Sequence, residues 1–110
     1  MAGRHRIRLR APWAAREEPQ GTVLRRRFHR PTGLDAGTRV FLVLEAVSAT
    51  LRLELNGAPL GESEGETGAE FELTGRLASF NELAVIVLGE APHEPAKDLP
   101  FQAALEVRSP

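Results

Sequence analysis

Hydrophobic and polar residues alternate in short runs along this chain. In Leu51–Leu55, leucines alternate with Arg52 and Glu54, and this period of two is typical of a half-buried strand. Turn-forming residues separate such runs at regular spacing, which favours an antiparallel sandwich or barrel. The pattern predicts about eight strands and no helix, with the strands at Arg6–Arg10, Val23–Arg30, Arg39–Val47, Thr50–Leu55, Ala58–Gly61, Glu70–Leu73, Glu82–Leu88 and Phe101–Val107.

Local signals settle three ambiguous segments. Asn56-Gly57 follows the leucine-rich strand at once and suits the positive φ angles of a tight hairpin. Ser79-Phe80-Asn81-Glu82 has the form of a helix capping box. However, the consecutive β-branched residues Val85-Ile86-Val87 favour a buried strand there. Ala11–Gln20 holds two prolines and is expected to be a connection.

Alternation also predicts which side chains face the core. The first strand should bury Ile7 and Leu9. In the second strand, Leu24 and Phe28 mark the core face. The same alternation places Arg26 partly inward, where its guanidinium needs a carboxylate or carbonyl partner.

The length of 110 residues predicts one domain, a single β-sandwich over residues 1–110. The hydrophobic content of 42% and the charged content of 26% are ordinary for a soluble globular protein. No apolar run is long enough for a membrane helix, and the first ten residues lack the apolar stretch of a secretory signal. We therefore expect a cytoplasmic protein without a membrane partner. The absence of cysteine excludes disulfides, thiolate metal sites and a cysteine nucleophile.

The formal net charge of −1 conceals an uneven distribution. Residues 1–30 hold nine arginines against two glutamates, a net of +7, whereas residues 31–110 hold five basic and thirteen acidic residues, a net of −8. One explanation is a basic patch for an anionic partner. The explanation that we favour is that basic N-terminal strands pair with acidic later strands across one sheet.

Five short motifs resemble the sugar-binding domain of family 2 glycoside hydrolases, of the β-galactosidase and β-glucuronidase type. They occur in the family's order over roughly residues 23–88, and their order and spacing make the resemblance more specific than any one of them. The motifs are Arg25-Arg26-Arg27-Phe28, Arg39–Val47, Leu53–Gly61 with its Asn-Gly turn, Phe71-Glu72-Leu73-Thr74 and Asn81-Glu82-Leu83-Ala84-Val85.

The resemblance implies a jelly-roll sandwich of the galactose-binding-like kind. In that family the domain is non-catalytic, and the catalytic acids lie on a separate barrel domain that has no counterpart in these 110 residues. The fold alone does not carry the function with it.

The chain offers no convincing catalytic residue. Gly61-Glu62-Ser63-Glu64-Gly65 has the form of a nucleophile elbow, but no predicted helix follows it, so we interpret it as a chance match in an acidic loop. The fifteen acidic residues single out no pair for glycoside cleavage. We therefore predict that the chain is not an enzyme.

No cofactor or metal is predicted either. Glu62, Glu64, Glu66 and Glu70 could contribute oxygen ligands to calcium, but they follow no defined loop motif, and a solvated loop is the better interpretation. The three histidines, His5, His29 and His93, show no metal-ligand spacing.

Carbohydrate recognition usually needs an exposed aromatic ring with polar groups around it. Four phenylalanines, Phe28, Phe41, Phe71 and Phe101, occupy strand positions and are expected in the core. That leaves Trp13 as the platform, and we take Trp13, Arg25 and Arg27 as the candidate ligand-binding residues. The interpretation that we favour for Trp13 itself is a lid that closes one end of the core, because large aromatic side chains dominate core burial.

Two functions follow as hypotheses. The first is a non-catalytic binding module with a carbohydrate ligand, which the resemblance suggests. The second is a protein-interaction or assembly module, with a protein partner or as a homo-oligomer, which the charge asymmetry suggests. Nucleic acid is not an expected partner, because no aromatic residues are interleaved with the arginines.

Overall fold

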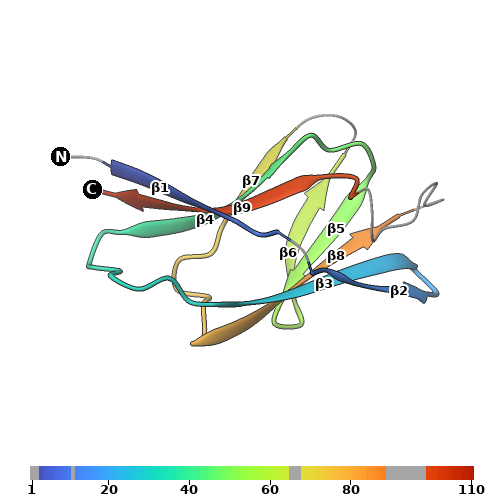
Figure 1. The fold of residues 1–110 in the computed structure, drawn as a ribbon, viewed down its shortest axis with the longest axis horizontal. Helices are drawn as coiled ribbons and strands as arrows, with labels where there is room; N and C mark the ends of the chain where they lie inside the picture. Colours follow the sequence, from blue (N-terminus) through green and yellow to red (C-terminus); the bar gives the residue numbers. More distant parts are fainter. Residues whose placement is uncertain (1–2, 11, 65–67, 89–98) are drawn as a thin grey trace.

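The computed structural model describes residues 3–10, 12–64, 68–88 and 99–110. These ranges contain nine strands and no helix, arranged as two antiparallel sheets that pack face to face (Figure 1). The strands are β1 (Gly3–Arg8), β2 (Ala14–Glu18), β3 (Gly21–His29), β4 (Arg39–Glu45), β5 (Leu51–Leu55), β6 (Ala58–Ser63), β7 (Ala69–Glu72), β8 (Phe80–Val87) and β9 (Gln102–Ser109).

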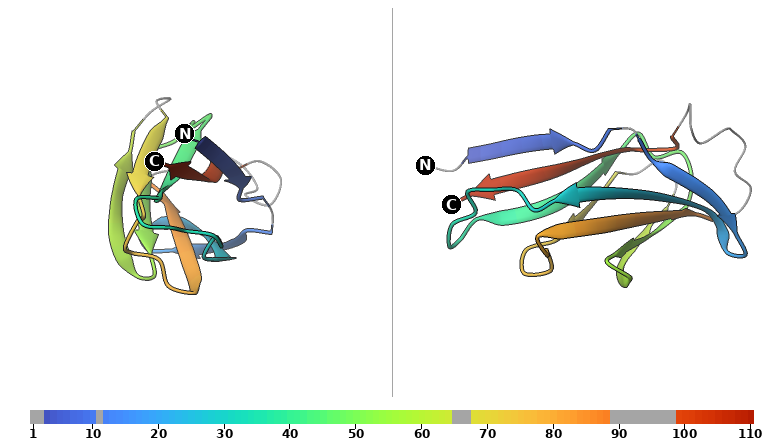
Figure 2. Two further views of the ribbon diagram at one scale, coloured as in Figure 1. Left: turned by 90° about the vertical axis from the view of Figure 1, so that its left-hand side faces the viewer. Right: turned by 60° about the horizontal axis from the view of Figure 1, so that its bottom comes forward.

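The chain crosses repeatedly between the two sheets, as expected for a jelly-roll sandwich. The four-stranded sheet has the order β1-β9-β4-β7, and the five-stranded sheet has the order β2-β3-β8-β5-β6. Figure 2 shows the two layers in further views, with β3 and β8 side by side. The predicted all-β antiparallel fold is therefore confirmed.

The core lies between the sheets and consists mainly of leucine and valine. Leu51, Leu53 and Leu55 are all buried, as their alternation with Arg52 and Glu54 predicts. Buried side chains from the two sheets pack against one another in a single hydrophobic cluster. The largest fully buried side chains are Leu24, Leu42, Leu44, Leu51, Leu53, Leu73, Leu83, Leu105, Val23, Val40, Val85 and Asn81.

The predicted Asn-Gly hairpin joins β5 to β6, with φ angles of 52° at Asn56 and 83° at Gly57. Asn56 also reaches a second strand, because its Nδ2 donates to Oδ1 of Asn81 at 3.0 Å and its Oδ1 accepts from the Glu82 amide at 2.8 Å. The side chain of Asn81 is in turn bonded twice to the backbone of Ala78. The two motif asparagines thus fasten the turn to the start of β8.

The segment Ala11–Gln20 is more than a connection, because it contains β2. β2 pairs with β3 from Glu18 opposite Gly21 to Ala14 opposite Arg25. Four of its five side chains are exposed, so no apolar alternation marks it as a strand in the sequence. Hydrogen bonding to β3 defines it instead, and Ala11 itself lies outside the described residues.

The first strand also differs from its prediction. Ile7 pairs with Leu105, but β1 is the edge of its sheet, so Ile7 remains 36% exposed rather than buried. Leu9 is buried as expected, beyond the end of the strand, with its amide bonded to the Ala103 carbonyl. Arg26 is partly inward, and its guanidinium donates to carbonyl oxygens of Arg10 and Arg27.

We expect Leu53→Ala to lower the free energy of unfolding by about 2–5 kcal/mol, because it leaves a cavity among fully buried neighbours. The matched variant Ile7→Ala, on the partly exposed edge strand, should cost about 1 kcal/mol or less. Urea denaturation measures both values, and equal losses would contradict this assignment of the core.

Candidate functional site

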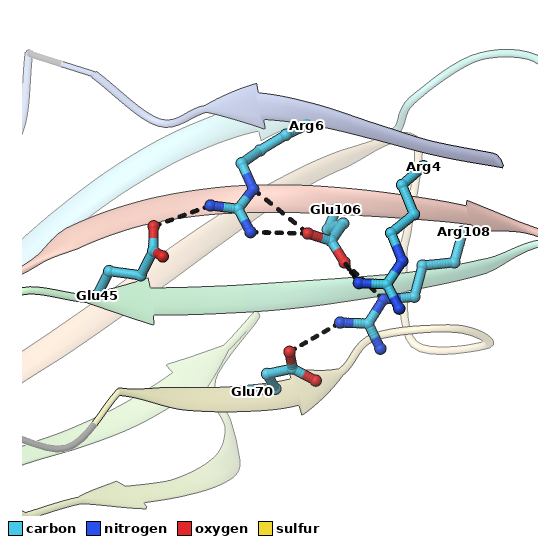
Figure 3. A network of polar contacts seen from close by, with 6 residues as sticks. All are labelled: Arg4, Arg6, Glu45, Glu70, Glu106 and Arg108. Atoms are coloured by element: carbon cyan, nitrogen blue, oxygen red, sulfur yellow. Dashed lines mark hydrogen bonds and ion pairs between the residues drawn. The ribbon is translucent and has the colours of Figure 1, made fainter.

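Arginines of β1 contact a nearly buried carboxylate on the outer face of the four-stranded sheet (Figure 3). Glu106 on β9 is only 4% exposed, and three guanidinium groups surround it. Its oxygens lie 3.4 Å from Nη1 of Arg4, 2.8 Å from Nη2 of Arg6 and 2.7 Å from Nε of Arg108. Hydrogen bonds from Arg6 and then from Arg108 hold the pKa of Glu106 below its ordinary value.

The network extends across the sheet to β4, which neighbours β9, and to β7 beyond it. Arg6 also binds Glu45 on β4 at 2.8 Å, and Arg108 binds Glu70 on β7 at 2.8 Å (Figure 3). Basic residues near the N-terminus therefore pair with acidic residues from later in the chain. This confirms, for this sheet, that cross-strand pairing accounts for part of the charge asymmetry.

Arg39 and Glu72 form a two-pronged ion pair on the same face, with N–O distances of 2.9 and 2.7 Å. The Arg39 hydrogen bond lowers the pKa of Glu72 to about 2. Phe41 is buried beneath Arg39 and Arg108, whose guanidinium carbons lie 5.0 and 3.9 Å from its ring centre. This phenylalanine thus packs under arginines on the outer face and does not belong to the cluster between the sheets.

The candidate ligand-binding residues meet elsewhere, at the free edge of β3. β2 stops pairing at Ala14, opposite Arg25, so the remainder of β3 has no paired strand on that side among the described residues. An open groove of about 570 Å³ lies there. It is lined by Pro12, Trp13, Ala14, Arg25, Arg26, Arg27 and Glu82.

Trp13 packs against the core and also lines the groove. Its ring is half-buried and packs edge-on against Phe101, with the ring centres 5.3 Å apart at an interplanar angle of 81°. Its Nε1 donates to the Leu9 carbonyl at 3.1 Å. These contacts fix the orientation of the indole, so a ligand would not have to order it.

The polar side chains in and beside the groove include both hydrogen-bond donors and acceptors. Arg25 binds Glu18 at 2.8 Å and lies 3.8 Å from Glu82, which also lies 3.5 Å from Nε of Arg27. The Arg25 hydrogen bond lowers the pKa of Glu18, and Glu18 in turn raises the pKa of Arg25. Arg27 is 70% exposed, so its guanidinium remains accessible to a ligand.

Glu82 is the groove residue that the sequence reading did not single out. In the pairing of β3 with β8, Glu82 lies opposite Arg27. Its neighbours Asn81 and Leu83 are buried, so the side chain of Glu82 points to the outer face of the sheet. That pattern was visible in the sequence, but only the pairing of β3 with β8 shows which arginine Glu82 meets.

Phe80 is a second candidate aromatic platform, where the sequence predicts Trp13 alone. It is 52% exposed and stacks on His29, with ring centres 4.8 Å apart and an interplanar angle of 29°. Phe80 lies two residues before Glu82 on β8, so its side chain points to the same, outer face of the sheet.

The serine motif and the acidic loop show no arrangement for chemistry in the part of the chain that is described. Ser63 ends β6 as a buried residue opposite Leu51, which is unlike a serine raised on a strand-to-helix elbow. Glu62 and Glu70 lie against Arg52 and Arg108. No cluster of three metal-ligating side chains occurs among the described residues; Gly65, Glu66 and His93 lie outside them.

No protein-family model matches the chain, and no curated protein matches its sequence. Solved structures do match its fold. A β-D-glucuronidase of Dictyoglomus thermophilum superposes with a TM-score of 0.72 at 12% identity, over 97% of this chain and 28% of its own. Bifidobacterium dentium β-glucuronidase gives a TM-score of 0.74 at 17% identity, over 94% and 30% of the two chains. A β-glucuronidase of an uncultured Clostridium species gives 0.73 at 15% identity, over 97% and 29%.

The shared feature is the fold. The chain resembles one part of family 2 β-glucuronidases, as the sequence motifs imply, and it spans less than a third of the length of these enzymes. Among the described residues, no helix is long and apolar enough to cross a membrane.

Acid should destabilise the fold partly through Glu72. Because its pKa falls from the ordinary value of 4.5 to about 2 on folding, its contribution is complete above pH 4.5 and is lost as the pH falls toward 2. We expect Glu72→Gln to make the unfolding free energy less dependent on pH in this range. Arg39→Gln, which removes the partner, should do the same, and wild-type pH dependence in both variants would contradict the assignment.

Proposed function

We propose that this chain is a non-catalytic carbohydrate-binding module whose ligand lies in the groove beside Trp13. The observation that carries the proposal is the meeting of Trp13, Arg25 and Arg27 in one groove, joined there by Glu82. The likeness in fold to enzymes named for their action on glucuronides supports it.

The chemistry of the groove suits a sugar. A pyranose ring has an apolar face that can pack on a fixed indole, and its hydroxyl groups both donate and accept hydrogen bonds. Arg27 offers hydrogen-bond donors and Glu82 offers acceptors, and the two side chains approach each other to 3.5 Å. Nucleic acid is not an expected ligand, because single-strand binders stack successive bases on several aromatic residues and Trp13 is the one aromatic residue of the described groove lining.

The described lining of the groove does not offer the pair of carboxyl groups that cleavage of a glycosidic bond needs. That reaction needs two carboxyl groups that flank the bond, one of them protonated as an acid. Among the described residues, Glu82 is the only carboxylate that lines the groove, and it lies 3.8 and 3.5 Å from Nε of Arg25 and Arg27. We therefore infer binding without catalysis.

The alternative, a protein-interaction or assembly module, stays a prediction. The ion pairs of Arg4 and Arg6 with Glu106 and Glu45 account for part of the charge asymmetry that suggested it. A cytoplasmic location also stays a prediction from the sequence.

Binding is tested on an array of neutral gluco-, galacto-, manno- and xylo-oligosaccharides and acidic glycans, followed by calorimetric titration of the best ligand. We expect Arg27→Gln to weaken binding at least tenfold, because it removes an exposed donor beside Glu82. The control Arg52→Gln changes another exposed arginine that lies beside a glutamate, on β5 and outside the groove lining, and should leave the affinity unchanged.

Trp13→Phe should weaken binding while the domain stays folded, because phenylalanine retains an aromatic contact to Phe101 but loses the bond to the Leu9 carbonyl. Circular dichroism checks the fold. Absence of binding to every glycan on the array, with folded protein, would overturn the proposed function.

A further inference from the structure

The outer faces of β3 and β8 continue past the groove to an exposed aromatic pair. Arg27 pairs with Glu82, and the next outward pair along the two strands is His29 with Phe80. Phe80 is 52% exposed, more than any other large hydrophobic residue in the described ranges. A half-exposed ring held by a stacked histidine offers an apolar platform at low entropic cost.

Polar groups surround this platform as they surround Trp13. A second open groove of about 620 Å³ lies beside it and is lined by His29, Arg30, Pro31, Thr32, Gly33, Leu34 and Ser79. The Arg30 amide donates to the Ser79 carbonyl at 3.0 Å, which holds the two loops together. The Arg30 guanidinium has no partner among the described residues, so its donors are available, together with the hydroxyls of Thr32 and Ser79.

Outward side chains of β3 connect the Trp13 groove, which Arg25 and Arg27 line, with His29, which stacks on Phe80. Arg25, Arg27 and His29 project from the same side of β3, and the span from Arg25 to His29 is roughly 13 Å at about 3.3 Å per residue. This distance exceeds the length of one pyranose ring. The paired Arg27 and Glu82 lie between the two aromatic sites and supply donors and acceptors along the way.

We infer that the module binds an oligosaccharide chain along β3, with Phe80 as a second sugar platform beyond the Trp13 groove. This inference rests on the proposed function and specifies its ligand as a chain of several sugar units rather than a single sugar.

Calorimetric titration compares monosaccharides with tetrasaccharides of the gluco-, galacto-, manno- and xylo- series. For the series that binds, we expect the wild type to bind the tetrasaccharide at least tenfold more tightly than the monosaccharide. Phe80→Ala should remove this gain and leave monosaccharide affinity unchanged, whereas Phe80→Trp should retain it. Ile7→Ala, which removes the other exposed large hydrophobic residue, on the opposite sheet, should change neither affinity.

The outcomes separate the two proposals. Equal affinity for both lengths, or a length gain that survives in Phe80→Ala, would overturn the oligosaccharide path while leaving binding at Trp13 intact. Failure of the wild type to bind any sugar of either length would overturn the proposed function and the path with it. Because Phe80 is half exposed, its variants should keep the wild-type melting temperature, which checks that the fold is unchanged.

Discussion

The pairing of β3 with β8 places alternate side chains of two long strands on opposite faces of the five-stranded sheet. Inward, Leu24 and Val85 join the core. Outward, the same register sets Arg27 beside Glu82 and His29 beside Phe80. A slip of one residue would bury the charged row and expose the apolar one, so the stability of the core also fixes the arrangement of the polar surface.

Much of the fold could be predicted from residue patterns, because burial on one face leaves a period of two in the sequence. Leu51–Leu55 and the Asn56-Gly57 turn are of this kind. β2 could not be found this way, since its side chains are largely exposed and only hydrogen bonding to β3 defines it. Ile7 follows the alternation but lies at a sheet edge, and edge position depends on the order of strands rather than on local sequence.

The candidate site could be predicted from the sequence only in part. Trp13, Arg25 and Arg27 could be selected by residue type, whereas their meeting depends on β2 ending at Ala14 and leaving the edge of β3 open. The arginines of β1 look similar in sequence to those of β3, yet Arg4 and Arg6 pair with Glu106, and Arg6 also pairs with Glu45. The arginines of β1 and those of β3 thus differ in how accessible they are to a ligand, because the order of the strands places different glutamates opposite them.

Gly3 lies opposite Ser109, so the polypeptide enters and leaves the sandwich at adjacent points (Figure 1). A unit with this geometry can be inserted into a surface loop of another protein, because the host has to bridge only the spacing of two paired strands. It can also be circularly permuted by a short linker between its ends. The hydrogen-bonded closure of β1 on β9 therefore makes the domain transferable as a single part, in which the register that builds the groove is carried along unchanged.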